Sequence, residues 1–582
     1  MWKIGAVPEN ALHIACEEGY DALVLKLLHE DPGLQTLEGL EKCLIAAISY
    51  RQQSVVQVLL KLLPTEPYAL FSLPRLRRIL YKTKTDVVET VLEYAAGNNC
   101  LWVIPSLLKH GARPSSPRGI SALHKAAWGG HEEVVTMLSK RILWRRGRKL
   151  SGILLCAIKR GHEGTVRILL DRGAGMPHDP SSPGAKHRAA KEGHERIFKL
   201  LLSKDSEDYY ADPRISLDTH RSPARTDLRW CCLHFAIYGR HYNIVKFLLE
   251  TDTMPRYHIQ HRATALPLAA KRGCSDIVKL LLETGFDVSA PLLGKSALEL
   301  AATSGYTRVM TLLLDAGATV GLNDLPNAVS SGSVSAVSLL LDSGANIQTE
   351  DSLGYTPLHL AVLDHHPKVV HLLLQSGAKK EAINCYATTP LLLAIQEKQV
   401  ECVSLLLEYG ADTESQPRPW TRNQMCGTHS TRTQSALSCA ITSNWPRLIP
   451  RLLQYGANIE AEGYMGQRPP HKAAGEGNAA ALETLLSSGA RKHARDEWQR
   501  TALHYAAEKG ACDAISTLLR WGFDIHAKDK NGQTPLHVAP YSKAYGLLVS
   551  HGAHTEGKDH SGMSAADSQA NRRYEYYASP LR

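Results

Sequence analysis

The chain has 582 residues, of which 44% are apolar and 21% are charged, and this balance is typical of folded proteins rather than of disordered ones. It has no run of 18 apolar residues and no apolar signal stretch near its N-terminus, so we expect neither a membrane span nor secretion. The 12 cysteines include no C-x-x-C pair, which favours an intracellular protein with reduced thiols, in the cytoplasm, the nucleus or both.

Positive charge is concentrated in one part of the chain. The net charge is +10, but residues 101–200 alone hold 19 Lys and Arg against 7 Asp and Glu, a net charge of +12. The other residues hold 48 basic and 50 acidic side chains and are therefore nearly neutral as a group. About one sixth of the chain carries the whole basic excess, as a patch at a definite place.

Two short phrases recur from one end of the chain to the other. One is Thr/Ser-x-Leu-His-x-Ala, as at 356–361 and 501–506, and the other is Leu-Leu-x-x-Gly-Ala, as at 313–318 and 373–378. The leucine of the first phrase returns mostly every 30 to 33 residues, although a few repeats replace it, as Lys186 does. A period that holds over the whole chain predicts one stack of repeats rather than several globular domains.

Each repeat has the pattern of two helices and a turn. Thr356 suits a helix N-cap, and Pro357 suits the first helical position, where its missing N–H costs nothing. Paired alanines such as those at 506–507 let two helices approach closely. Gly377 is expected as the left-handed cap of a second helix, and the Asp-x-x-Gly sequence at 529–532 is expected as a tight turn.

These phrases resemble those of the ankyrin-repeat family, and the resemblance covers essentially the whole chain. It is clearest in DKNGQTPLHVA at 529–539 and TALHYAAEKG at 501–510. About sixteen such units in one register are a highly specific signal. The resemblance implies an all-α fold, an ankyrin-repeat α-solenoid of helix-turn-helix units with β-turn or finger loops, in which each repeat is stable only against its neighbours.

Three intervals between repeats are longer than the rest and predict inserted loops at about 64–88, 204–227 and 412–433. In this family such loops border the concave face, so the inserts are either tolerated surface loops or partner-specific fingers. We divide the remaining chain into partly degenerate N-terminal repeats at 1–112, basic repeats at 113–203, central repeats at 228–411, C-terminal repeats at 434–553, and a terminal cap and tail at 554–582.

Some repeats depart from the pattern. Pro105 and Pro450 fall inside predicted second helices, where an interior proline costs about 3 kcal/mol, so we expect these helices to be short or bent. For the repeat around Leu536 we expect a shortened second helix.

Several patterns imitate catalytic or metal sites. Of the 27 histidines, eight follow the repeat leucine and four more begin second helices, so we interpret them as structural. The stretches at 131–135 and 194–198 lack the second histidine of a zinc-binding helix, and Gly294-Lys295-Ser296 lacks the first glycine of a P-loop. We therefore predict no catalytic residue, no cofactor and no metal. Because the repeats fill the chain, they leave no room for a catalytic domain, and we expect no enzyme.

The run KRILWRRGRK at 140–149 contains six Lys and Arg. It is interpreted as a solvated loop, as a contact for an acidic partner, or as a nuclear-import or nucleic-acid segment. Aromatic residues are not interleaved with the cations as base stacking requires, so nucleic acid is not the expected partner.

A stripe of cations is expected on the concave face, because ankyrin-like stacks bind partners through finger turns and the ends of first helices. Those helix ends hold Trp128, Lys159, Arg160, Lys191, Tyr238, Lys271 and Arg272, and the turns add Arg118, Arg148 and Lys149. Aligned charges steer an oppositely charged partner, so we expect an acidic protein segment there, with the two aromatic residues as anchors. The alternative is that the cations serve solubility alone.

The predicted function is that of a monomeric, non-enzymatic scaffold or adaptor for protein–protein interaction, which is what the family resemblance implies. The alternative is a nuclear transcription co-regulator that acts through chromatin-associated partners.

Overall fold

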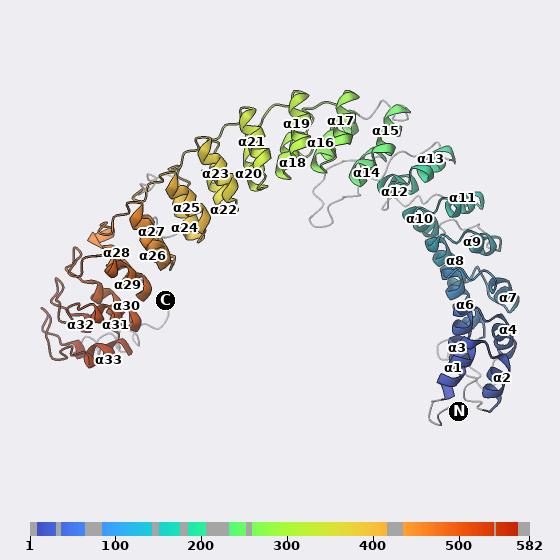
Figure 1. The fold of residues 1–582 in the computed structure, drawn as a ribbon, viewed down its shortest axis with the longest axis horizontal. Coiled ribbons are helices and arrows are strands. Elements are labelled where there is room, and N and C mark those ends of the chain that lie inside the picture. Colours follow the sequence, from blue (N-terminus) through green and yellow to red (C-terminus); the bar gives the residue numbers. More distant parts are fainter. Residues whose placement is uncertain are drawn as a thin grey trace. The chain divides into compact units, whose positions relative to one another are not determined.

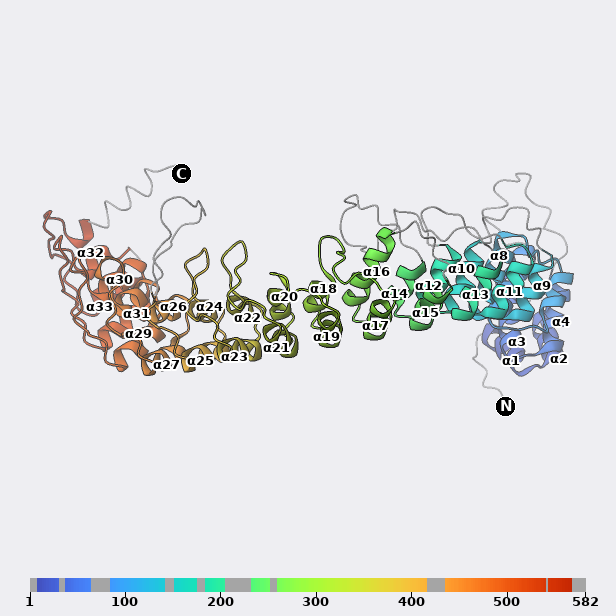
Figure 2. The same ribbon diagram turned by 90° about the horizontal axis from the view of Figure 1, so that it is seen from above.

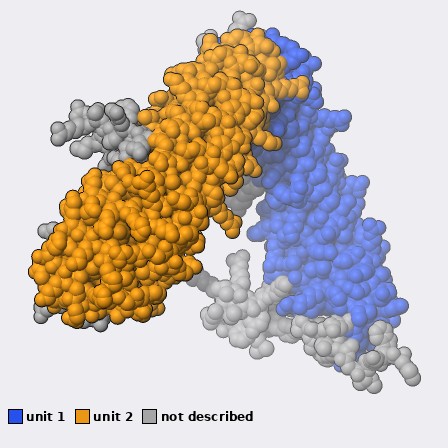
Figure 3. All heavy atoms as spheres, turned by 60° about the vertical axis from the view of Figure 1, so that its left-hand side comes forward, with its two compact units in different colours: residues 1–294 blue, residues 295–582 orange. Residues whose placement is uncertain are grey.

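The computed structural model describes residues 8–30, 37–63, 84–141, 151–174, 184–204, 232–251, 259–415, 435–540 and 543–567. Over these ranges the chain consists of helices and turns, with one isolated β-bridge between Lys558 and Ser564 and no β-strand. The all-α fold is thereby confirmed. The chain divides into two compact units, unit 1 at Met1–Gly294 and unit 2 at Lys295–Arg582 (Figure 3).

Unit 1 is a stack of helix pairs in which each first helix packs on the first helix of the next repeat and on its own second helix (Figure 1). The first helices are α1 (Pro8–Glu18), α3 (Leu37–Ser49), α6 (Lys84–Gly97), α8 (Pro117–Gly129), α10 (Ser151–Arg160), α12 (Ala185–Glu192), α14 (Cys232–Gly239) and α16 (Ile259–Lys271). The second helices are α2 (Asp21–Glu30), α4 (Gln53–Leu62), α7 (Ile104–Lys109), α9 (Glu132–Ser139), α11 (Glu163–Asp171), α13 (Glu195–Lys204), α15 (Tyr242–Glu250) and α17 (Ser275–Glu283).

Unit 2 repeats this arrangement, and the finger loops before its helices α22 and α24 project to one side of the stack (Figure 2). The first helices are α18 (Ala297–Thr303), α20 (Asp324–Ser330), α22 (Pro357–Leu363), α24 (Pro390–Gln396), α26 (Ala436–Thr442), α28 (Pro469–Gly475), α30 (Ala502–Lys509) and α32 (Pro535–Val538). The second helices are α19 (Thr307–Asp315), α21 (Val334–Asp342), α23 (Pro367–Gln375), α25 (Val400–Glu408), α27 (Ile449–Gln454), α29 (Ala479–Ser487), α31 (Cys512–Arg520) and α33 (Lys543–Ser550). Two 3-10 turns complete the unit, η3 (Pro446–Leu448) and η4 (Tyr464–Gly466).

The repeat residues have the structural roles that their pattern predicts. Pro357 stands in the first turn of α22, and Gly377 takes a left-handed φ of 84° after α23. The Asp529 carboxylate accepts from the amides of Asn531 and Gln533, at 2.9 and 2.8 Å, and so closes the turn before α32. The paired alanines at 506–507 have no exposed surface, which lets neighbouring first helices pack closely.

Both predicted proline effects are confirmed. α7 and α27 are only six residues long, and in each the proline lies in the first turn, where a backbone N–H has no helical partner. Ahead of α27 the chain forms η3 instead of a further α-helical turn. Each helix therefore begins one residue before its proline, so that no proline lies in the helix interior.

The prediction of a shortened second helix in the repeat around Leu536 is wrong. The short helix is the first one, since α32 has four residues whereas α33 has eight. Pro540 explains the difference: a proline disfavours the helical conformation of the residue before it, and Ala539 is extended with a ψ of 134°.

Most of the three predicted inserts lies outside the described residues, which omit 64–83, 205–231 and 416–434. Two predicted inserts overlap described helices at one end. The last residues of the first insert belong to α6, which begins at Lys84, and the first residue of the second insert is Lys204, the last residue of α13. The basic run from residue 142 onward and the terminal tail from residue 568 also lie outside the described residues.

Candidate partner-binding site

The predicted site residues lie at the ends of consecutive first helices of unit 1. These helices pack side by side, so their last turns follow one another along the stack (Figure 1). A left-handed residue then turns the chain sharply into the second helix, as at Gly130 with a φ of 73° and Gly161 with a φ of 80°. We call the residues in or beside these last turns the cationic stripe: Trp128, Lys159, Arg160, Lys191, Tyr238, Lys271 and Arg272.

The stripe contains a first cluster around Trp128, at the end of α8. The Arg160 guanidinium lies 4.1 Å from the indole ring centroid, and the Lys159 ammonium lies 5.8 Å from it. Both cations come from α10, one repeat further along the chain. The indole is still 38% exposed, so this cluster combines two cations with an accessible aromatic surface.

A second cluster of the same kind surrounds Tyr238 at the end of α14. Lys191, from the preceding repeat, places its ammonium 5.5 Å from the phenol ring centroid, and Arg272, from the following repeat, places its guanidinium 4.4 Å from it. The tyrosine therefore lies between cations from both neighbours. The aromatic side chains of the stripe thus help to hold the cations in place.

The positive charge of the stripe is not neutralised by the surrounding repeats. Over the part of the chain that the structure describes, the side chains of Lys159, Arg160, Lys191, Lys271 and Arg272 make no ion pair. Lys159 and Arg160 are exposed in the last turn of α10, where positive charge also complements the helix dipole. The outward-facing charge remains available to an anionic group.

Histidines immediately before the second helices hold the backbone of the stripe. In each case the ring Nε2 donates to the carbonyl oxygen of a stripe residue in the preceding repeat, because a carbonyl can only accept. The pairs are His162 with Trp128 at 2.9 Å, His194 with Lys159 at 3.3 Å, and His241 with Lys191 at 2.8 Å. The interpretation of these histidines as structural is consistent with these bonds, which fix the spacing of the stripe from one repeat to the next.

Of the predicted site residues, Arg118 lies apart from the stripe. Arg118 lies in the first turn of α8 rather than in a turn between repeats, and its guanidinium donates to the Asp86 carbonyl at 3.2 Å and to the Thr90 hydroxyl. It therefore ties α8 to α6. Arg148 and Lys149 lie outside the described residues.

The structure also reveals a pair beside the stripe that the sequence pattern did not single out. The Sγ of Cys156 on α10 lies 2.9 Å from Nε2 of His124 on α8. Burial raises the pKa of the Cys156 thiol, while the charges of Lys159 and Arg188 act in the opposite direction. Position within a first helix does not distinguish this cysteine from others, so only the packing of α8 on α10 could have identified it.

The described residues contain no cluster of three or more His, Cys, Asp or Glu side chains placed to hold a metal ion. Within the same ranges, no helix combines the length and apolar character that crossing a membrane requires.

Comparison with known proteins identifies relatives of the repeats. The family profile described as "Ankyrin repeats (3 copies)" matches residues 186–292, 233–324, 325–417 and 471–559, which together make up more than half of the chain. The chain is 26% identical over 200 residues to the transient receptor potential cation channel subfamily A member 1 homolog of Caenorhabditis elegans, a match that covers 34% of this chain and 15% of that protein. It is 30% identical over 135 residues to the ankyrin repeat protein FPV014 of fowlpox virus (strain NVSL), covering 23% of this chain and 28% of that protein.

The matches thus span less than a third of either relative's length. Two solved structures are also similar, the ankyrin repeat domain of human ASB11 and that of Bcl-3, a member of the IkappaB family. They cover 39% and 40% of this chain and 96% and 99% of theirs, at 24% and 28% identity and a TM-score of 0.33 each. The repeat register, the paired helices and the family match together show that the chain belongs to the ankyrin-repeat family.

Proposed function

We propose that this chain is a non-enzymatic interaction scaffold whose unit 1 binds an acidic segment of a protein partner along the cationic stripe. Ankyrin repeats are in general protein–protein interaction modules. The observation that carries the finer proposal is the pair of cation–aromatic clusters around Trp128 and Tyr238. They lie in one row and have no ion-pair partner among the described residues.

The clusters favour binding because they hold the cations before the partner arrives. Immobilising a long side chain at an interface costs about 0.5–1.5 kcal/mol, and Arg160 and Arg272 already rest on aromatic rings. A guanidinium over a ring can still offer N–H groups at its edge to a carboxylate. The charge would raise the association rate, and the accessible indole of Trp128 would add apolar contact.

The proposal assigns no reaction to the chain. Among the histidines of the described repeats, His162 and His241 are engaged as hydrogen-bond donors to backbone carbonyls. A ring held in this way positions a neighbouring repeat rather than a substrate.

Charge reversal tests the proposal directly. Changing Lys159, Arg160, Lys271 and Arg272 to glutamate in the full chain should leave the fold intact, because the two lysines and Arg160 are exposed and Arg272 is partly so. The variant should lose the proteins that the wild-type chain retains from cell extract, as identified by mass spectrometry. Retention by the wild-type chain should weaken as salt is raised.

A matched control carries the same change of charge on the second helices of the same unit. It replaces four exposed cations with glutamate: Arg167 on α11, Lys199 on α13, Lys246 on α15 and Lys279 on α17. The control should retain the partner. Equal retention by both quadruple variants, or retention that does not depend on salt, would show that the stripe is not the binding site.

A further inference from the structure

Unit 2 contains a basic surface that is separate from the stripe and that the repeat pattern does not require. It lies in the finger that begins after Gly489, where the sequence Arg491-Lys492-His493-Ala494-Arg495 places four basic side chains within five residues. The corresponding positions of other fingers have defined structural tasks. The residues at 491–495 differ from those that have these structural roles, and this difference is the first indication of a separate function.

The first of these positions normally closes a turn. In five other fingers an Asn or Asp side chain accepts from the amide two residues ahead, at distances of 2.8 to 2.9 Å: Asp287, Asn346, Asp412, Asn458 and Asp524. Arg491 stands at the same place and cannot accept a hydrogen bond. The finger therefore has a positive charge in place of the turn bond, as does the finger with Lys379 at the same position.

In three consecutive fingers a carboxylate at the third position links one finger to the next. Glu381 accepts from the amide of Asp412, Glu414 from that of Asn458, and Glu460 from that of Arg491, at distances of 2.8 to 2.9 Å. His493 occupies the next place in this series. A carboxylate is thus absent where three consecutive fingers carry one, and the local charge becomes more positive.

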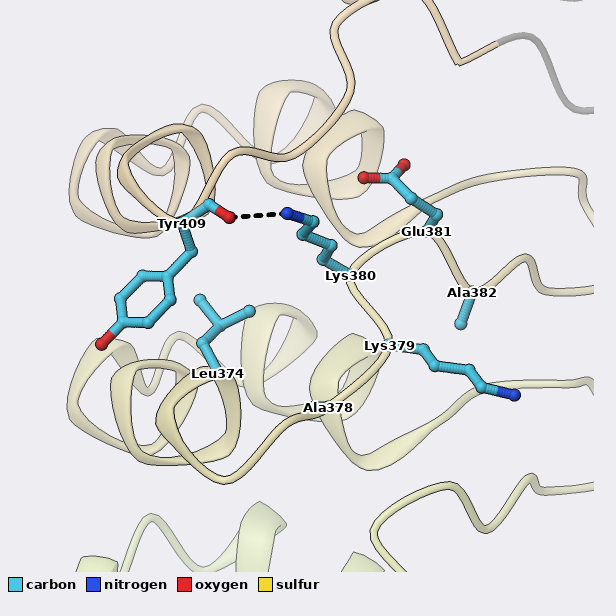
Figure 4. Close-up of a pocket in the computed structure, with 7 residues that line it drawn as sticks. All are labelled: Leu374, Ala378, Lys379, Lys380, Glu381, Ala382 and Tyr409. Carbon is cyan, nitrogen blue, oxygen red and sulfur yellow. Dashed lines mark hydrogen bonds between the residues drawn. The ribbon is translucent and has the colours of Figure 1, made fainter.

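Two hollows at equivalent positions show the effect of this change. The first, of about 420 Å³, is lined by Leu374, Ala378, Lys379, Lys380, Glu381, Ala382 and Tyr409. Figure 4 shows the Lys380 ammonium reaching the Tyr409 carbonyl oxygen, at 2.7 Å. The Glu381 carboxylate supplies negative charge to this hollow, while burial raises the pKa of Glu381.

The second hollow, of about 490 Å³, is lined by Arg468, Arg491, Lys492, His493, Ala494 and Arg495, and we call it the basic hollow. Arg468 is already neutralised by Glu460 at 2.9 Å and Glu462 at 2.8 Å. Within the described residues, however, Arg491, Lys492 and Arg495 make no side-chain ion pair. Three exposed cations that form no side-chain ion pair among the described residues therefore line one hollow.

Part of the basic hollow is held in place. Arg495 donates from Nη1 to the carbonyl oxygens of Lys528 at 2.7 Å and Gln499 at 3.1 Å, which orients its guanidinium. The Lys492 ammonium lies 5.1 Å from the Trp521 ring centroid. The two fingers that form the hollow also carry exposed aromatic residues, Tyr464 at 57% and Trp498 at 45% exposure.

We propose that the basic hollow binds a phosphorylated segment of a partner protein. A phosphoserine or phosphothreonine carries nearly two negative charges and three acceptor oxygens. These match the two guanidinium groups and the one ammonium group of the hollow that form no ion pair with a described residue. A single carboxylate would leave most of that charge uncompensated.

Bead-bound degenerate peptide libraries that differ only in a fixed central residue test this assignment. The full chain is applied to libraries with phosphoserine, serine or glutamate at the centre, and to vesicles that contain a phosphoinositide. We expect about tenfold stronger retention on phosphoserine than on serine, with glutamate in between. Equal retention on serine and phosphoserine, or retention on the vesicles alone, would overturn the proposal.

Two variants assign the retention to the hollow. Arg491→Glu with Lys492→Glu should reduce phosphoserine retention to the serine level, and His493→Glu, which restores the carboxylate of the other fingers, should reduce it too. The control is Lys379→Glu with Lys380→Glu, which makes the same charge change in the hollow of Figure 4 and should retain the phosphopeptides. Unchanged binding by both hollow variants would refute the assignment.

The basic hollow and the cationic stripe lie in different units, so their tests are independent. The quadruple reversal of the stripe should leave phosphoserine retention unchanged, and the hollow variants should leave the acidic partner of unit 1 bound. Loss of phosphoserine retention in the stripe variant would place the phosphate site in unit 1 and overturn the proposal.

Discussion

His504→Ala tests whether the buried histidines join consecutive repeats. His504 lies in α30 with no exposed surface, and its Nδ1 accepts from the Thr501 amide at 3.1 Å. Since Nδ1 accepts, Nε2 carries the proton and donates to the Gln533 carbonyl oxygen of the next repeat, at 3.1 Å. One neutral ring thus caps its own helix and holds its neighbour.

The expected loss follows from these contacts. Each backbone hydrogen bond contributes about 1 kcal/mol net, and leaving a partly buried backbone group without a partner costs at least about 1 kcal/mol more. We therefore expect His504→Ala to destabilise the repeats around α30 by about 3 kcal/mol. His493→Ala is the matched control, because His493 is exposed and should change stability by less than about 0.5 kcal/mol.

Hydrogen exchange followed by mass spectrometry measures this loss in the full chain. Because each repeat contacts only its neighbours, amides of α28 to α32 should exchange roughly a hundredfold faster in His504→Ala, while unit 1 should be unaffected. Equal exchange in His504→Ala and His493→Ala would refute the reasoning.

The same variant has a defined pH dependence. Burial lowers the pKa of His504 below the ordinary value of 6.5, so the unfolded chain takes up this proton first as the pH falls. The contribution of His504 to stability is therefore complete above pH 6.5 and decreases below it. The difference between wild type and His504→Ala should shrink in acid; a difference that grows would contradict the neutral-ring assignment.

Four further predictions concern individual side chains and one glycine. Burial also lowers the pKa values of His359 and His471, so the melting temperature should fall as the pH is taken below 6.5 in calorimetry. Burial raises the pKa of Asp324 to about 6, so Asp324→Asn should raise the melting temperature at neutral pH but not below the ordinary value of 3.8. Gly161→Ala should cost about 1–2 kcal/mol in urea unfolding, because its φ is 80° and a Cβ would lie 2.6 Å from an imidazole carbon. Arg118→Ala should speed hydrogen exchange in α6 and α8 without changing partner retention, since this side chain ties those helices together.

The fold could be predicted because most of its signals are local and repeated. A proline after a capping threonine, paired alanines and a glycine after the second helix act within one or two helical turns, and Gly377 shows this in its φ of 84°. The misassigned repeat around Leu536 shows the limit of such reasoning. The sequence suggests that the second helix of this repeat is the short one. In the structure the first helix is short, because Pro540 ends it.

The positions of the stripe could be predicted, but not its clusters. Lys159 and Arg160 belong to the end of a first helix by register alone. That both approach the Trp128 ring depends on the rotamers and on how closely α8 and α10 pack, which no period in the sequence encodes. Arg118 fails for the same reason: its sequence position suggests a turn, but its partner lies on a helix of the preceding repeat.

The basic hollow shows why charge counts along a chain can miss a surface. Residues 101–200 stand out by their net charge. The finger at 491–495 does not, because Asp496 and Glu497 follow it directly and offset part of its positive charge in the sum. The Asp496 carboxylate is already engaged by the amides of Trp498 and Arg500, at 2.8 and 2.7 Å, so it serves the turn. The carboxylate that matters is the one missing at His493, and its absence becomes visible only when Glu381, Glu414 and Glu460 are seen to bond the next finger.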